Sequence, residues 1–308
     1  MDEDPINDEQ DALMRPKITL PQVGISSGDP KQENKSLFCQ RKLLNICEAD
    51  LKDPDLAYEM TDGPKRGICL IFNHHEFDKK TGQSRRDGTN KDAECMQKLF
   101  AGLKYDVKVF TDATTSQYLD AINQVRSMDH SSYDSFVCII LSHGDNGHIY
   151  TYDQNLPLDW IVSQFRGDVC PFLVGKPKLF FIQACRGSTF DGGAHKMESD
   201  DAGDRLSYKL PVEADILVSN STFPGYFAWR NSREGSWYIQ ELYQTLMDDL
   251  VSPVRHDIIT LLAKVARKVA VLYESNTGQM QSHGKKQMTN YTSTLTKLCY
   301  LTGKPTAK

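Results

Sequence analysis

The sequence predicts an α/β fold, a three-layer sandwich in which helices flank a mostly parallel central sheet. Two observations predict it. Short runs of almost entirely apolar residues recur along the chain, and longer stretches with apolar residues at positions i, i+3, i+4 and i+7 lie between and after them. A strand that is apolar at nearly every position is buried on both faces, as in parallel sheets. A helix with one apolar face can cover such a sheet.

The individual elements follow from these two patterns. Five apolar runs are predicted to be strands, at 67–73, 105–110, 135–142, 176–184 and 214–220. The stretch 290–301 is predicted to be a final strand. Amphipathic helices are predicted at 91–103, 114–128, 158–166, 236–250 and 257–275. The alternation of strands and helices is typical of a sheet that is covered on both faces.

Two segments lack the apolar residues of a packed core. Residues 1–62 are rich in Asp, Glu, Asn, Pro and Lys, and are predicted to be a mostly disordered leader. Residues 188–209 contain Gly, Ser and Asp and almost nothing apolar, which indicates an exposed linker. A loop of this length is usually functional or a connection. It divides the globular part into a larger piece, 63–200, and a smaller one, 201–308.

The composition argues against several classes of function. Lys and Arg number 36 against 41 Asp and Glu, and the basic residues are scattered, so nucleic acid is not an expected partner. The acidic N-terminus is unlike a signal peptide, and no run approaches the roughly 20 apolar residues of a membrane span. We therefore expect a cytoplasmic protein with no membrane partner. The eight cysteines include no Cys-x-x-Cys pair, so we expect no metal site and no cofactor.

Two of the predicted strands end in residues that carry chemistry. One is followed by His143 and Gly144, and the other by Cys185. Ligands of open α/β sheets bind beyond the carboxyl ends of the strands. If these two strands are neighbours, an imidazole and a thiol meet there, which is the pairing that a nucleophilic cysteine needs. Each residue alone would more often be a buried core residue, and the combination favours catalysis.

The glycine after the histidine has two interpretations. A glycine at a strand end lets a substrate carbonyl approach the backbone closely. The amides of Gly144 and Cys185 could then stabilise an oxyanion. The alternative is that Gly144 only permits a turn before Asp145.

The pentapeptide QACRG at 183–187, with a histidine upstream, resembles the caspase family. The resemblance extends from about residue 64 to 300. Other matching segments are SHG at 142–144, KPKLFFI at 176–182, PVEAD at 211–215, PGYFAWR at 224–230 and GSW at 235–237. It implies a cysteine endopeptidase that cleaves proteins after aspartate and is made as a zymogen. The short leader is similar to that of the executioner branch, which acts in apoptosis.

The resemblance also implies a binding site for the P1 aspartate. Caspases hold this side chain between two arginines and a glutamine, and the matching positions are Arg86, Arg230 and Gln183. Two guanidinium groups suit one planar carboxylate. Arg85 directly precedes Arg86, and the spacing to the following Gly-Thr pair selects Arg86. The alternative is that both arginines are ordinary surface residues.

Further substrate contacts are implied at the positions that follow the linker. Phe227 and Trp229 match an apolar wall for P2, Trp237 matches a residue of the P4 site, and Asn231 is included among the substrate-binding residues. The alternative for the aromatic residues is a place in the core. The segment that holds Phe227, Trp229 and Arg230 must bend if all three are to face one side.

Activation is expected to require cleavage in the linker. Asp200, Asp201 and Asp204 are candidate cut sites, and Asp11 in the leader is another. The resemblance further implies a homodimer of large and small subunit pairs, an upstream initiator caspase as activator, and inhibitor proteins as partners.

Two other functions remain possible at this point. One is a catalytically inactive relative that acts by binding, but such proteins generally lose the nucleophile, the base or the P1 arginines, all of which this chain keeps. The other is a related peptidase with basic P1 specificity. It would need acidic residues at 86 and 230.

Overall fold

The computed structural model describes residues 53, 56–60, 65–145, 147–186, 211–276 and 282–303. These residues belong to one compact unit, 49–308. The predicted linker 188–209, with Asp200, Asp201 and Asp204, lies outside the described residues, as does Asp11. Their proposed roles stay predictions.

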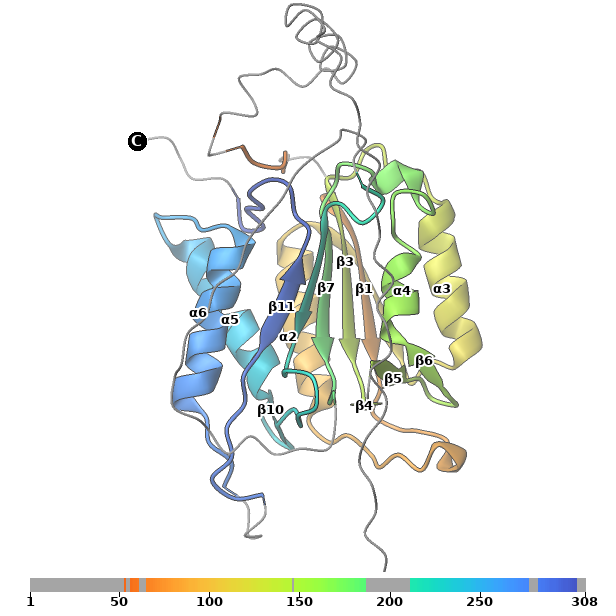
Figure 1. Ribbon diagram of the computed structural model, residues 1–308, viewed down its shortest axis with the longest axis vertical. Coiled ribbons are helices and arrows are strands. Elements are labelled where there is room, and N and C mark those ends of the chain that lie inside the picture. Colours follow the sequence, from red (N-terminus) through yellow and green to blue (C-terminus); the bar gives the residue numbers. More distant parts are fainter. Residues whose placement is uncertain are drawn as a thin grey trace, which may run out of the picture. The chain divides into compact units, whose positions relative to one another are not determined.

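A six-stranded sheet forms the centre of this unit, in the order β11-β8-β7-β3-β1-β2 (Figure 1). The strands are β1 (Gly67–Asn73), β2 (Tyr105–Thr111), β3 (Ser135–Leu141), β7 (Lys178–Gln183), β8 (Ile216–Asn220) and β11 (Asn290–Ser293). Every neighbouring pair is parallel except β11 with β8. The predicted three-layer fold with a mostly parallel sheet is therefore confirmed.

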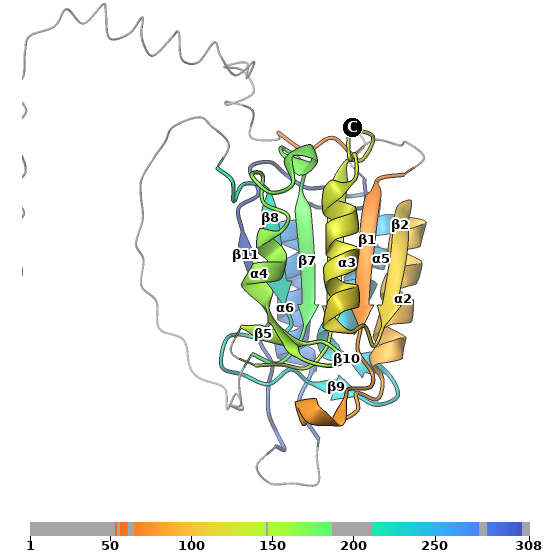
Figure 2. The same ribbon diagram turned by 90° about the vertical axis from the view of Figure 1, so that its right-hand side faces the viewer.

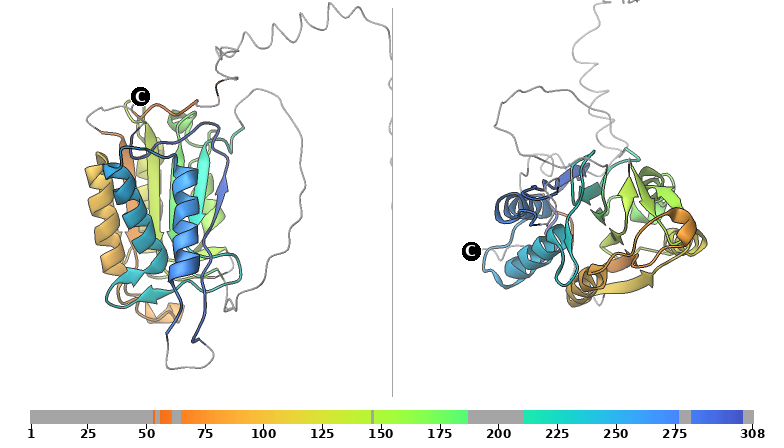
Figure 3. Two further views of the ribbon diagram at one scale, coloured as in Figure 1. Left: turned by 90° about the vertical axis from the view of Figure 1, so that its left-hand side faces the viewer. Right: turned by 90° about the horizontal axis from the view of Figure 1, so that it is seen from below.

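Helices cover both faces of the sheet. On one face lie α3 (Thr115–Ser127) and α4 (Leu158–Ser163), as Figure 2 shows. On the other lie α2 (Thr89–Gly102), α5 (Trp237–Val251) and α6 (Ile258–Leu272), as Figure 3 shows. Alternate strand residues separate into two cores: Ile71 packs with the α2, α5 and α6 layer, and Phe72 packs with the α3 and α4 layer.

Several short elements lie near the carboxyl ends of the parallel strands (Figure 2). They were not predicted, because two or three residues carry no measurable periodicity. They are the 3₁₀ helix η3 (Lys79–Thr81) and the strands β4 (Gly144–Asp145), β5 (His148–Tyr150), β6 (Asn155–Pro157), β9 (Arg230–Asn231) and β10 (Gly235–Ser236). Another 3₁₀ helix, η4 (Pro171–Leu173), precedes β7.

The two largest differences from the predicted boundaries share one reason. The end of the predicted leader packs on the domain, because Tyr58 is buried and its hydroxyl donates to Asp215 at 2.6 Å. The predicted final strand stops at Ser293. The backbone beyond it bonds to the leader segment instead, with the Tyr58 amide donating to the Leu298 carbonyl at 2.9 Å. Among the described residues, no helix is long and apolar enough to cross a bilayer.

Candidate active site

Neighbouring strands bring His143 and Cys185 to the same edge of the sheet. β3 pairs with β7 in parallel, with Leu141 opposite Gln183, and each catalytic candidate lies two residues beyond its strand. The Ser142 amide donates to the Gln183 carbonyl at 3.0 Å, which extends the pairing past the regular strands. β3 and β7 are therefore neighbours, which is the condition under which the sequence predicts that the imidazole and the thiol meet.

Gly144 is required by a close approach of two backbones. A Cβ atom at this position would lie 2.6 Å from the Cys185 carbonyl oxygen and 2.9 Å from the Ala184 Cβ atom. Real Cβ atoms do not approach other atoms so closely, so any other residue would push the histidine and cysteine segments apart. Gly144 belongs to β4, and the turn that follows has its positive φ at Gly147. The turn alternative therefore does not explain Gly144.

The His143 imidazole is held by a main-chain carbonyl. Its Nε2 atom lies 2.8 Å from the Ser84 carbonyl oxygen. Since a carbonyl only accepts, Nε2 carries the proton, and Nδ1 is left to take up another. Burial, with the charges of Arg86 and Arg230, lowers the pKa of His143 to about 4, against the opposing effect of the Ser84 hydrogen bond. The imidazole is thus neutral near pH 7, as a general base must be.

The Cys185 thiol is half-buried and held beside the segment before β9. The Ala228 amide donates to Cys185 Sγ at 3.4 Å. Four of the other described cysteines are fully buried and only Cys95, on α2, is comparably accessible. The sulfur also influences the pKa values of Arg86 and Arg230, so the nucleophile and both predicted arginines belong to one electrostatic cluster.

Arg86 is a fully buried cation, and part of its guanidinium group has no hydrogen-bond partner among the described residues. Its side chain is 1% exposed, and Nη1 donates to the His74 carbonyl and to Thr89 Oγ1, both at 2.8 Å. Its Nε and Nη2 atoms are buried and have no partner within the described residues, and the same holds for the amide oxygen of Gln183. Burial, with the Arg230 charge, lowers the pKa of Arg86 to about 9. Unpaired buried donors on a cation call for an anion.

Arg230 completes the cationic site from another segment. Its Nε donates to the Asp87 carbonyl at 2.7 Å. The two arginine segments are in contact, because a Cβ on Gly88 would lie 2.3 Å from the Asn231 carbonyl oxygen. Gly88 also has φ +88°, which glycine adopts without strain. The surface alternative is wrong for Arg86, whereas the adjacent Arg85 is exposed and pairs with Asp87 at 2.8 Å.

Two of the three predicted aromatic contacts, Trp229 and Trp237, lie together, and all three lie outside the core. The rings of Trp229 and Trp237 stack with their centroids 5.7 Å apart. Trp237 is the first residue of α5, and the centroid of its ring lies 5.2 Å from that of Tyr273. Phe227, Trp229 and Trp237 are only partly buried, so the core alternative is wrong. Asn231 is exposed, and its side-chain oxygen accepts from the amides of Arg233 and Glu234. In this structure that oxygen therefore stabilises the β9–β10 turn.

Three residues of the site were not predicted from the sequence. Ser84 acts through its backbone, and Phe77 contacts the imidazole of His143, with ring centroids 5.1 Å apart. Asp92 is buried near both arginines and accepts from the Ser236 amide at 2.8 Å and its hydroxyl at 2.5 Å. Burial raises the pKa of Asp92 to about 6. Asp92 lies on the same buried face of α2 as Thr89, Ala93 and Met96. An acidic residue on a buried helix face is unusual, and this pattern could have identified Asp92 from the sequence.

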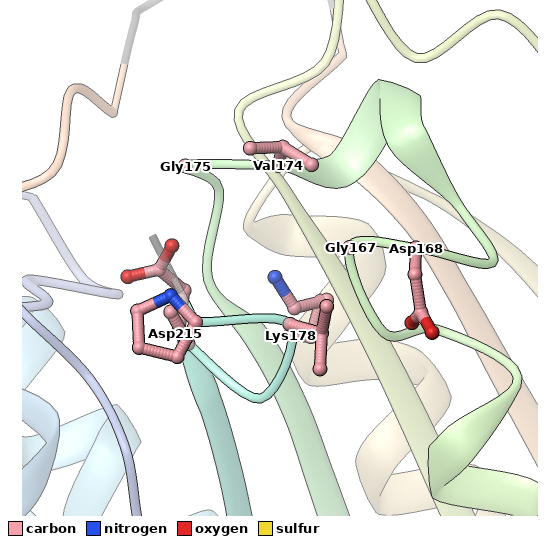
Figure 4. A pocket seen from close by; sticks show the side chains of 9 residues that line it. Gly167, Asp168, Val174, Gly175, Lys178 and Asp215 are labelled. Carbon is pink, nitrogen blue, oxygen red and sulfur yellow. The ribbon is translucent and has the colours of Figure 1, made fainter. Parts of the chain in front are cut away.

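A separate pocket of about 160 Å³ lies at the other end of the sheet (Figure 4). Its lining includes Lys178, at the start of β7, and Asp215, just before β8. Because the catalytic candidates follow the carboxyl ends of the strands, this pocket takes no part in their chemistry. No cluster of metal-ligating side chains occurs among the residues that the structure describes.

Comparisons with known proteins agree on one family. The family model described as the caspase domain matches residues 66–300. Caspase-3 from Mus musculus is 45% identical over 248 residues, which cover 80% of this chain and 87% of that protein. Caspase-3 from Bos taurus is 42% identical over 244 residues, or 79% of this chain and 87% of the relative. The crystal structure of caspase-1 from Spodoptera frugiperda has a TM-score of 0.73 and 38% identity, covering 81% of this chain and 94% of its own.

Proposed function

Since this chain belongs to the caspase family, we propose that Cys185 and His143 are its catalytic pair and that Arg86, Arg230 and Gln183 bind the P1 aspartate. The protein is an executioner caspase-like cysteine endopeptidase with an apoptotic role. It cleaves protein substrates after aspartate and assembles as a dimer, as the family does.

The observation that carries this proposal is the buried guanidinium of Arg86 with two unpaired donors. A carboxylate between Arg86 and Arg230 would accept these hydrogen bonds and offset the repulsion between the two cations. A glutamate would extend one methylene too far and misalign the bonds, so aspartate should be preferred. A basic P1 side chain would add a third positive charge to the cluster, which argues against the alternative specificity.

The reaction then follows from the two strand-end groups. Cys185 Sγ attacks the carbonyl carbon of the scissile bond and the thiol proton passes to His143. The histidine gives this proton to the amine of the leaving peptide as the C–N bond breaks, which leaves a thioester on Cys185. Water, deprotonated by His143, then hydrolyses the thioester and restores the thiol. The amides of Gly144 and Cys185 stabilise the oxyanion.

We assign residues 63–200 to a large subunit that carries the catalytic pair, and 201–308 to a small subunit that carries Arg230. The edge strand β11 pairs with its twin in the homodimer, which we place in the cytoplasm. An initiator caspase is the proposed activator, and inhibitor proteins are further partners. Phe227, Trp229, Trp237 and Asn231 contact substrate residues on the N-terminal side of P1.

Self-cleavage of the linker tests the proposed function with the protein as its own substrate. The purified chain should split into two fragments, and mass spectrometry should place the new C-terminus at Asp200, Asp201 or Asp204. Substituting all three by Ala should abolish the predicted linker cut, because no P1 aspartate remains at these positions. Linker cleavage of that variant after another aspartate would place the cut elsewhere, and a new C-terminus at a residue other than aspartate would contradict the proposal.

A further inference from the structure

We infer that Phe77 is a positioning residue for the reaction, because its ring contacts both the imidazole of His143 and the buried imidazole of His74. The Phe77 ring contacts His143 at 5.1 Å between centroids with a 41° tilt, and stacks on His74 at 5.8 Å and 26°. This inference rests on the proposed role of His143 and adds to it a side chain that touches neither substrate nor the reacting atoms.

The imidazole of His143 needs such a support. Its one hydrogen bond in the described structure is to the Ser84 carbonyl, and among the described residues no carboxylate pairs with its ring. A single bond at Nε2 fixes one point of the ring but leaves its plane free to rotate. An aromatic face beside the ring restricts that rotation and keeps water from one side of it. Misplacement of a catalytic group by about 1 Å can cost on the order of 10²-fold in rate.

Phe77 itself rests on a stack of buried rings. His74 is fully buried, and neither of its ring nitrogens has a partner among the described residues. It stacks on Tyr118 at 5.8 Å, and Tyr118 stacks on Phe72 at 3.6 Å. Burial, together with the Arg86 charge, lowers the pKa of His74 to about 3, so this ring stays neutral and adds no positive charge near His143.

The backbone around Phe77 is fixed on both sides. The His74 amide donates to the Leu141 carbonyl at 2.9 Å, and the Asp78 amide donates to the Tyr152 carbonyl at 2.7 Å. The His74 carbonyl in turn accepts from Arg86 Nη1 at 2.8 Å. One short segment therefore contributes both the aromatic ring beside His143 and a carbonyl that accepts a hydrogen bond from Arg86.

Replacing Phe77 by Leu tests this inference, because Leu keeps the apolar volume and removes the ring. For an Asp-containing peptide, kcat should fall by about tenfold or more while KM changes less than about twofold. Water reaching His143 should also raise its pKa toward the ordinary value. Protonated histidine cannot act as base, so the acid limb of kcat/KM should move to higher pH. The charged groups that act on His143 are Arg86 and Arg230, and both of these arginines are in turn influenced by the Cys185 thiol.

Two variants complete the experiment. Phe77→Tyr keeps the ring and should retain kcat within about threefold of the wild type. Phe110→Leu removes a ring that stacks on Phe72 at 5.1 Å, at the far end of the same column, and should leave the acid limb in place. The inference is overturned if Phe77→Leu leaves kcat and the acid limb unchanged, if Phe110→Leu moves the limb equally, or if Phe77→Tyr is as impaired as Phe77→Leu. Activity of the wild type on the Asp peptide is independent of these outcomes.

Discussion

Replacing Cys185 by Ala should lower kcat/KM for an Asp-containing peptide by at least about 10⁴-fold. Without the sulfur no thioester can form, and the remaining groups can only polarise the scissile bond. The substitution removes one atom from a half-buried position and leaves both strands intact, so the melting temperature should stay close to that of the wild type. Steady-state cleavage and thermal melting of both proteins measure these two expectations.

Cys95 provides the matched control for this prediction. It is the other half-buried described cysteine, and it lies on α2 away from the strand ends. Cys95→Ala should retain the wild-type rate within about twofold, which separates loss of the nucleophile from a general effect of losing a thiol. A Cys185→Ala protein that cleaves the peptide at the wild-type rate would refute the assignment of the nucleophile.

Replacing Arg86 by Met should have the second largest effect. Methionine is unbranched and about as long as the arginine stem, so it fills the space of that stem without the charged guanidinium group. The substrate carboxylate would then enter a buried site with one cation instead of two. Removing a partner from a buried charge-assisted pair costs about 3–5 kcal/mol, or a loss on the order of 10²- to 10⁴-fold in kcat/KM. Kinetics with the same Asp-containing peptide measure this loss.

The neighbouring Arg85 makes the test specific. Its side chain is exposed and bonds to Asp87 at the surface, so Arg85→Met should change kcat/KM by less than about threefold. Equal losses in the two variants would indicate a general effect of charge on substrate approach. A larger loss in Arg85→Met than in Arg86→Met would show that Arg85, and not Arg86, contacts the P1 side chain.

Much of the fold could be predicted because its signals are strong and local. β1 was predicted at its observed bounds, and β3, β7 and β8 within two residues at either end. These strands are buried on both faces, which leaves a continuous apolar run in the sequence. The final strand was predicted to be too long because Cys299 and Leu301 are buried core residues that lie outside any strand. Burial alone does not distinguish a residue of a strand from a buried residue of an irregular segment.

The catalytic site was predictable in a different way. Cys185 and His143 follow strand ends, so the topology alone brings them together. Arg86 and Arg230 come from segments more than 140 residues apart, and only the family resemblance linked them. Phe77 lies in an irregular segment, and its contact with His143 depends on how that segment folds back on the sheet. No periodicity encodes such a contact, and the structure was needed to find it.

The measurement that tests the central claim most directly is a panel of four peptides that differ only at P1, with Asp, Glu, Asn or Arg, cleaved by the purified wild-type protein. Two guanidinium groups in a closed site should favour Asp by several hundredfold or more over Glu and Asn, and Arg should give no detectable product. Comparable rates for Asp and Asn, or efficient cleavage after Arg, would contradict the account.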